Sequence, residues 1–463
     1  MTRIKIKNFF FLLFAWAISI VTIIVYYSYY KVDINKYIYA IVYAFFSSCT
    51  MIYVFGCFDN NDTDRISLAP VLLLITTLYN QNALTKFSVD KLFIGFVSNQ
   101  MIRLFGSIVF DLLIMFVAFR YKRKNKDTND TSATFEELFR YKKPSIIFIY
   151  IMIILYAIIK FQELSTKIEF SRTQSTFINA ITYAVYFLIS LNAFLYRKNV
   201  VFAYTPLLIV TSLQFVASVK SGRKAEIIVF MFIIMMELVY LGCIKIEVLK
   251  MAFCISPAIL QIITVLTEAI SGRMRFFSKG FVMEYHAFRY DLSDFAISIA
   301  MNYKPSKLVI QLISESFIYA IPGFSIDVKK NILENGAYRM LLENMGFPRY
   351  DIYGSMSDFN DTFFSVGAQI GGFIGIPLFF IIIVAFFDWL SRVLCRNRYG
   401  KVLVMILIGP CALVECDLKM LIFRIRDLVI IIVVAYMIIK LLCKDGLVIR
   451  IKKRVFRAHI DKK

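Results

Sequence analysis

The chain has 463 residues, of which 59% are hydrophobic and only 18% charged. This balance lies outside the range of ordinary soluble domains and excludes that class. The formal net charge of +21 would suggest a nucleic-acid partner in a soluble protein. Here the basic residues follow the pattern of cytoplasmic loops instead, so we expect no nucleic-acid binding.

Apolar runs long enough to cross a bilayer recur along the whole chain. They predict an all-α polytopic membrane protein with about twelve transmembrane helices, because backbone groups within lipid must be satisfied inside helices. We expect one membrane domain over residues 1–463, with the first run retained as a span because no cleavage site follows it. The expected spans are 8–30, 37–57, 66–81, 100–119, 144–162, 176–196, 199–218, 225–243, 249–268, 362–390, 401–417 and 427–443. The eleventh contains Gly409-Pro410, where we expect a kink.

Lysine and arginine collect on alternate links between these spans. The positive-inside rule then places both termini in the cytoplasm. The strongly basic links are 120–143, 197–198, 245–250, 391–401 and the tail after 443. The opposite side receives short links and one long segment, 271–361, with apolar stretches such as Leu308 to Ile321 at helical spacing. We interpret 271–361 as an ordered extracytoplasmic loop, and a loop of this length usually has a function.

Three cations crowd one short extracytoplasmic link, Lys220-Ser221-Gly222-Arg223-Lys224. This placement opposes the positive-inside rule, and unfavourably placed charge near a membrane is usually functional. Guanidinium suits bidentate contact with phosphate, lysine adds a point charge, and the next helix directs its first amides to the same place. We interpret Lys220, Arg223 and Lys224 as a clamp for a lipid-linked diphosphate. The alternative is that these side chains only extend to the lipid headgroups.

A second charged cluster follows the ninth expected span. Its members are Arg273, Arg275, Glu284, His286, Arg289, Asp291 and Asp294. The three arginines supply positive charge where an anionic leaving group would need it. His286 titrates near neutral pH and is a candidate base or phosphate ligand, with a purely structural loop histidine as the alternative. Glu284 is the candidate catalytic carboxylate, and the alternative is that all three acids form only salt bridges.

A third segment, Asn360-Asp361-Thr362, leads into a span with four closely spaced glycines. An N-cap role explains Asp361 without any chemistry. The glycine spacing between Gly367 and Gly375 favours close helix packing over a site.

Ionisable residues inside the expected spans bear on a transport function. Those noted are Asp111, Lys160, Glu237, Glu268, Glu415 and Asp417. A proton-coupled transporter needs some of them at mid-membrane, and Asp111 and Glu237 are the best placed. Neither a nucleotide-binding loop nor a metal motif occurs, and no cysteine lies within 271–361, so we expect no cofactor, metal or disulfide framework.

Taken together, these segments resemble the Wzy-type O-antigen polymerases. The resemblance rests on the Ser-Gly-Arg-Lys-Ala-Glu link at 221–226, the arginine-led loop running through Tyr285 to Asp294, and the stretch from Asn360 to Gly372. It implies a fold related to the GT-C glycosyltransferases and O-antigen ligases, with 271–361 as a large periplasmic loop. It also places the protein in the bacterial inner membrane with a periplasmic active site.

The activity implied by this resemblance is the joining of polyprenyl-diphosphate-linked oligosaccharide repeat units, without a metal. Arg223, Arg273 and Arg289 would stabilise the departing diphosphate, with Lys220, Lys224 and Arg275 as further diphosphate ligands. Glu284 or His286 would deprotonate the acceptor hydroxyl. The expected partners are the lipid-linked donor and acceptor, membrane lipids and a chain-length regulator protein.

The principal alternative is a lipid-linked oligosaccharide flippase or another secondary transporter. Such proteins line a central cavity with charge between two similar halves. This chain places its unusual charge in extracytoplasmic loops, which favours the polymerase.

Overall fold

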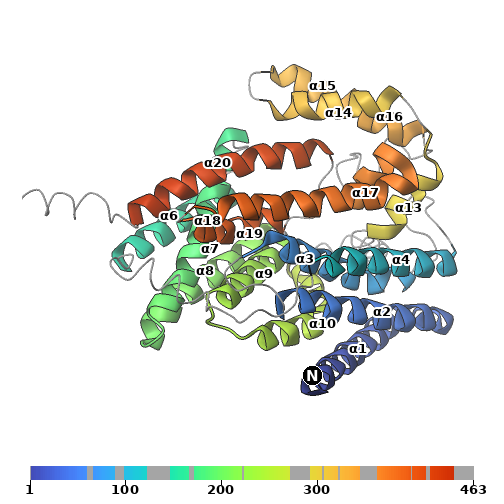
Figure 1. The fold of residues 1–463 in the computed structure, drawn as a ribbon, viewed down its shortest axis with the longest axis horizontal. Helices are drawn as coiled ribbons and strands as arrows, with labels where there is room; N and C mark the ends of the chain where they lie inside the picture. Colours follow the sequence, from blue (N-terminus) through green and yellow to red (C-terminus); the bar gives the residue numbers. More distant parts are fainter. Residues whose placement is uncertain are drawn as a thin grey trace, which may run out of the picture.

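A computed structural model describes residues 2–59, 66–88, 99–121, 146–165, 172–221, 224–271, 292–304, 307–321, 324–344, 362–397, 399–412 and 418–442. Nearly all of these residues are helical, and none of them lies in a strand, which confirms the all-α class (Figure 1). Within the described ranges, six helices are long and apolar enough to cross a membrane. They are α1 (Thr2–Tyr30), α2 (Ile34–Asp59), α4 (Gln100–Phe119), α7 (Arg172–Leu195), α8 (Val200–Ser221) and α17 (Phe363–Leu394).

The remaining helices fill the intervals between these six. In the first part of the chain they are α3 (Leu68–Asn82), the 3-10 helix η1 (Ala83–Ser88), α6 (Ile146–Ser165), α9 (Lys224–Tyr240) and α10 (Ile246–Ser271). In the second part they are α13 (Leu292–Met301), α14 (Lys307–Ala320), α15 (Ile326–Asn335), α16 (Ala337–Asn344), α18 (Gly400–Ile406), α19 (Ile408–Cys411) and α20 (Leu418–Leu442). The eleventh expected span is interrupted at Leu407, between α18 and α19, and not at Gly409-Pro410 as expected. Gly409 lies inside α19, and it packs so closely against Tyr183 that a Cβ there would lie 2.3 Å from the ring.

Side-chain contacts fix the direction in which the helices run. Lys7 Nζ lies 3.5 Å from Glu247 Oε1, and the Cys254 thiol lies 3.6 Å from the Phe11 carbonyl oxygen. The later residue of α1 contacts the later residue of α10, so the two helices are parallel and begin at the same end of the bundle. We call this the first end, and the opposite one the second end.

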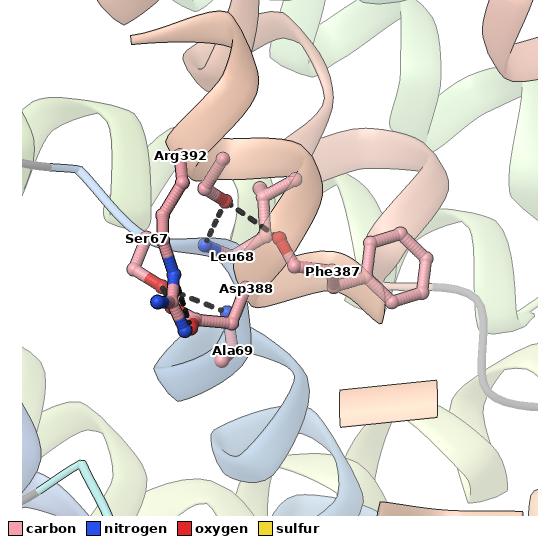
Figure 2. Close-up of polar contacts among 7 residues, drawn as sticks. Ser67, Leu68, Ala69, Phe387, Asp388 and Arg392 are labelled. Atoms are coloured by element: carbon pink, nitrogen blue, oxygen red, sulfur yellow. Dashed lines mark hydrogen bonds and ion pairs between the residues drawn. The ribbon is translucent and has the colours of Figure 1, made fainter. Parts of the chain in front are cut away.

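A polar clamp holds three more helix termini at the first end, and Figure 2 shows its contacts between the start of α3 and the end of α17. Ser67, just before α3, donates to Asp388 at 3.1 Å, and the Leu68 amide donates to Ser391 Oγ at 2.9 Å. Arg392 Nε donates to the same Asp388 carboxylate at 3.0 Å. Tyr240, at the end of α9, donates to the Ser67 carbonyl at 3.1 Å. The start of α3, the end of α9 and the end of α17 therefore meet where α10 begins.

The second end is defined by the other termini of the same helices. Tyr27, near the end of α1, donates to the Leu84 carbonyl in η1 at 2.7 Å. Tyr43, in the first half of α2, donates to the Asn80 carbonyl near the end of α3 at 2.7 Å. Arg103, at the start of α4, donates to the Lys86 carbonyl at 3.1 Å. The helix termini that lead into the basic links lie at the first end, as the alternation of charge predicts.

The tenth expected span, 362–390, is not one continuous helix. The corresponding α17 consists of two helices that fold back on each other. Gly371 and Gly372 have non-helical backbone angles, and Gly372 has a φ of 58°. The Phe364 and Phe380 rings lie 4.8 Å apart, although sixteen residues of straight helix would separate them by about 24 Å. Residues 363–370 therefore lie antiparallel against the helix that continues to Leu394. The N-cap is Thr362, and Asp361 lies outside the described residues.

Glycines permit this reversal. The prediction of close packing between Gly367 and Gly375 is confirmed, and the two packed segments both belong to α17. A Cβ on Gly367 would lie 2.5 Å from the Gly375 carbonyl oxygen, and one on Gly375 would lie 2.0 Å from that of Gly367. Only two residues without side chains allow the two backbones to approach so closely.

Part of the expected loop 271–361 belongs to the core of the bundle. Helix α13 packs between α4 and α17, and its Phe295, Ala296 and Ile299 are almost fully buried. Gly106 of α4 faces Ile297, whose side chain occupies the space that a Cβ would need. The three later helices of this segment, α14 to α16, lie together beside α20 (Figure 1).

Candidate functional site

The cation-rich link at 220–224 joins two helices that are separated by only two residues. Helix α8 ends at Ser221 and α9 begins at Lys224, so Lys220 lies in the last turn of one and Lys224 opens the other. This agrees with the expected helix start near Ala225. Arg223 lies outside the described residues.

Most of the second predicted cluster lies between two described helices, and its last member, Asp294, lies within α13. Helix α10 ends at Ser271 and α13 begins at Leu292. Five of its predicted site residues lie outside the described residues: Arg273, Arg275, Glu284, His286 and Arg289.

Helix directions bring the attachment points of these two segments to the same end of the bundle. Helices α8, α9 and α10 pack against one another, and α9 begins only two residues after α8 ends. Because α9 ends at the first end beside Ser67, its start lies at the second end. Helix α10 starts at the first end beside Lys7, so its last residue, Ser271, also lies at the second end.

The structure adds a buried polar cluster that the sequence analysis did not identify, between α2, α3, η1 and α4. Lys86 and Arg103 are both fully buried, and Asp111 is 1% exposed. The Lys86 ammonium donates to Ser107 Oγ and lies 5.1 Å from the centre of the Tyr43 ring. Asn80 Nδ2 donates to Asp111 Oδ1 at 2.5 Å. We call Asn80, Lys86, Arg103, Ser107 and Asp111 the buried cluster.

The cluster brings charge of both signs into the half of the bundle nearer the second end. Buried ionisable side chains within membrane helices are costly, and they commonly mark a functional path. Asp111 Oδ2 and Asn80 Oδ1 are also buried without a hydrogen-bond partner among the described residues. Two neighbouring acceptors of this kind suit a hydroxyl, a water or a proton.

A spacing in the sequence could have identified this cluster. Arg103, Ser107 and Asp111 recur every four residues and so share one face of α4. Lys86 falls in the link between the expected spans 66–81 and 100–119. In the structure it belongs to η1 and contacts that face of α4. Its burial follows from tertiary packing and not from local hydropathy.

Glu237, the other carboxylate that favoured transport, lies near the first end. It is in the last turn of α9, which ends at Tyr240 and not at residue 243 as expected. One of its oxygens accepts from Ser190 Oγ at 2.7 Å. Glu237 is as buried as Asp111, but its place near the first end makes it a weaker candidate for a central site.

Among the described residues, no three His, Cys, Asp or Glu side chains gather as metal ligands would. Comparison with known proteins gave no match to any family model, curated protein or solved structure. A functional assignment therefore rests on the sequence pattern and on the arrangement of the helices.

Proposed function

We propose that this chain is a polysaccharide polymerase of the kind that the Wzy-type resemblance implies, acting at the periplasmic face of the bacterial inner membrane. The observation that carries the proposal is a shared location. The link with Lys220, Arg223 and Lys224 and the end of α10, from which 272–291 continues, lie at the second end, away from the basic links. Positive charge gathered at that end suits an anionic lipid-linked substrate.

The topology that accompanies this proposal has about twelve spans and both termini in the cytoplasm. The first end is then cytoplasmic, because helix termini there lead into the basic links 120–143, 197–198 and 391–401. The second end is periplasmic, and 271–361 belongs to it except where α13 enters the bundle.

The reaction follows from the chemistry of an activated donor. The acceptor hydroxyl oxygen forms a bond to the anomeric carbon of the donor sugar, whose bond to the diphosphate breaks. The leaving diphosphate departs with the bonding electron pair and is stabilised by Arg223, Arg273 and Arg289, with Lys220, Lys224 and Arg275 beside them. The hydroxyl proton passes to Glu284 or His286. Neither a cofactor nor a metal has a step in this scheme.

The test is polymerisation by purified protein with polyprenyl-diphosphate-linked repeat units, in the presence of chelator and without nucleotide sugar. The expected product is a ladder of chain lengths on a gel. Arg223→Ala should abolish the ladder, whereas the control Lys198→Ala, in the short link between α7 and α8 at the first end, should leave it intact. A ladder that survives Arg223→Ala would remove the site, and the absence of any ladder from the unmodified protein would remove the polymerase.

The buried cluster favours a second candidate function, a lipid-linked oligosaccharide flippase or other secondary transporter. Lys86, Arg103 and Asp111 are charged groups inside the bundle, as a coupled transporter requires. Passage of the lipid-linked unit across reconstituted vesicles, without a ladder, would support this alternative. The polymerase is preferred because a transporter would give the cations of the α8–α9 link no role.

A further inference from the structure

The helical pair α14–α15 has a defined direction relative to α20. Tyr338 of α16 lies with its ring 4.8 Å from Lys419 Nζ, and the Ala337 amide donates to Glu315 of α14 at 2.8 Å. Five residues further along α14, the Ala320 carbonyl accepts from Arg426 at 2.8 Å. Later residues of α14 therefore lie beside later residues of α20, and the two helices run parallel.

Helix α20 runs from the second end toward the first. Thr176, near the start of α7, donates to Asp427 at 2.9 Å. The Tyr399 ring, just after α17 ends, lies 6.2 Å from that of Tyr436. Because α14 is parallel to α20, it also runs from the second end toward the first, and its last turn is the part nearest the first end.

This turn lies level with the point where α20 is expected to enter the bilayer. Ala320 contacts Arg426, directly before the span expected at 427–443. Lys419, beside Tyr338, lies seven residues earlier on α20, or about 10 Å further out. Relative to the span expected at 427–443, Tyr338 and Lys419 therefore lie outside the membrane and the end of α14 lies at its boundary.

The described residues on either side of 322–323 expose apolar side chains. Four large side chains from the end of α14, the turn and the start of α15 are substantially exposed: Phe317, Ile321, Phe324 and Val328. Lys329 folds back over them, and its ammonium donates to the Ile321 carbonyl at 2.9 Å. We call these four apolar residues the α14–α15 tip.

We infer that the α14–α15 tip inserts into the periplasmic leaflet of the bilayer beside α20, as a membrane-dipping hairpin within the loop 271–361. The occupant of this apolar surface is lipid. Exposed apolar side chains at this depth meet acyl chains and not water. The inference requires α20 to span the membrane but is independent of the proposed enzyme activity.

Lipid is preferred over a protein partner because of where the apolar side chains lie. The four residues of the tip lie at the end of the pair that is level with Arg426, whereas the exposed Ile310 and Ile313 lie nearer the start of α14. Arg424, Arg426 and Asp427 mark a charged boundary on α20 at the level of the tip. Interfacial segments combine an apolar tip with charged residues at the headgroup level in this way.

The test uses the full chain in lipid nanodiscs, one copy per disc, with lipids brominated on their acyl chains. Trp16→Phe and Trp389→Phe remove both native indoles. An indole is then introduced by Phe324→Trp at the tip, or by Ile310→Trp as the control. Ile310 is 73% exposed but lies about 15 Å before the end of α14. Val328→Trp replaces the tip variant if Phe324→Trp does not give a monodisperse protein.

The expected result is at least twofold stronger quenching by brominated lipid at the tip than at position 310, with the reverse order for iodide in water. Quenching of the tip indole by iodide but not by bromine would overturn the inference. Protection from both quenchers would also overturn it, because the tip would then be covered by protein.

Discussion

The Tyr303 hydroxyl donates a hydrogen bond to the Ile370 carbonyl at 3.0 Å, and the same phenol ring lies against Gly372. Ile370 is at the point where α17 reverses, and its carbonyl has no helical partner ahead of it because the next two glycines leave the helical conformation. Tyr303 follows α13, so this contact fastens the loop segment 292–304 to the hairpin of α17.

Tyr303→Phe should lower the free energy of unfolding by about 1 kcal/mol, because a part-buried carbonyl loses its donor while the ring contact remains. Thermal unfolding in detergent provides the measurement. Tyr204→Phe, on the exposed side of α8, is the control and should leave the melting temperature unchanged. Equal melting temperatures for both variants would mean that the hydroxyl does not hold the hairpin.

The two glycines that face each other in α17 give a sharper comparison. Gly367→Ala and Gly375→Ala should each destabilise the protein by about 1–3 kcal/mol, because the added methyl group meets backbone at 2.5 Å or less. Gly371→Ala is the matched control, since a Cβ there meets nothing within 4 Å and its φ is −146°. If all three variants melted together, residues 363–370 would not be folded back on α17.

Ser67→Ala should cost about 1 kcal/mol, because it removes the donor to Asp388 and an acceptor for the Ala69 amide at the start of α3. Ser314→Ala, an exposed serine of α14, is the control. Unfolding midpoints in the same detergent measure both. A midpoint unchanged by Ser67→Ala would show that α3 does not depend on this clamp.

Substitutions at Asp111 separate a structural role from transport. Asp111→Asn keeps an oxygen for the Asn80 amide, so it should change stability little and leave polymerisation intact. Asp111→Leu should lower stability by about 1–3 kcal/mol, because Asn80 then has a buried donor without a partner. Loss of transport in vesicles with Asp111→Asn, at normal stability, would instead support the transporter.

Epitope insertion tests the assignment of the two ends. A short tag between Asp33 and Ile34, at the second end, should bind antibody in intact spheroplasts. A tag between Lys198 and Asn199, at the first end, should bind only after permeabilisation. The reverse pattern would invert the topology and move the cations of the α8–α9 link to the cytoplasm.

Much of the helical framework follows from sequence. Ten of the twelve expected spans each fall on one helix, and the stretch from Leu308 to Ile321, with its helical spacing, forms α14. The tenth falls on the two folded-back parts of α17 and the eleventh on the short helices α18 and α19, with 413–417 outside the described residues. Hydropathy predicts these elements because a backbone in lipid can satisfy its polar groups only within a helix or closed barrel. The interruption of the eleventh span was also expected, although it falls at Leu407 and not at Gly409-Pro410.

Burial of charge was harder to predict from sequence. Lys86 lies in a polar stretch and Arg103 near a helix start, and both positions are ordinary for exposed side chains. Their burial depends on η1 crossing the face of α4, a contact between segments with no local signal. The candidate diphosphate clamp, in contrast, can be recognised from the local sequence, because three cations lie within one short link.

The sequence by itself determined the class of this protein, the positions of its helices and the alternation of its basic links, because these depend on composition over one helix length. Only the tertiary structure decided that α17 folds back at Gly371 and Gly372, that α13 enters the core and that the α14–α15 tip points along α20. An apolar run has the same hydropathy whether it crosses the bilayer or reverses within it. The direction of each helix is set by the neighbours that its side chains contact.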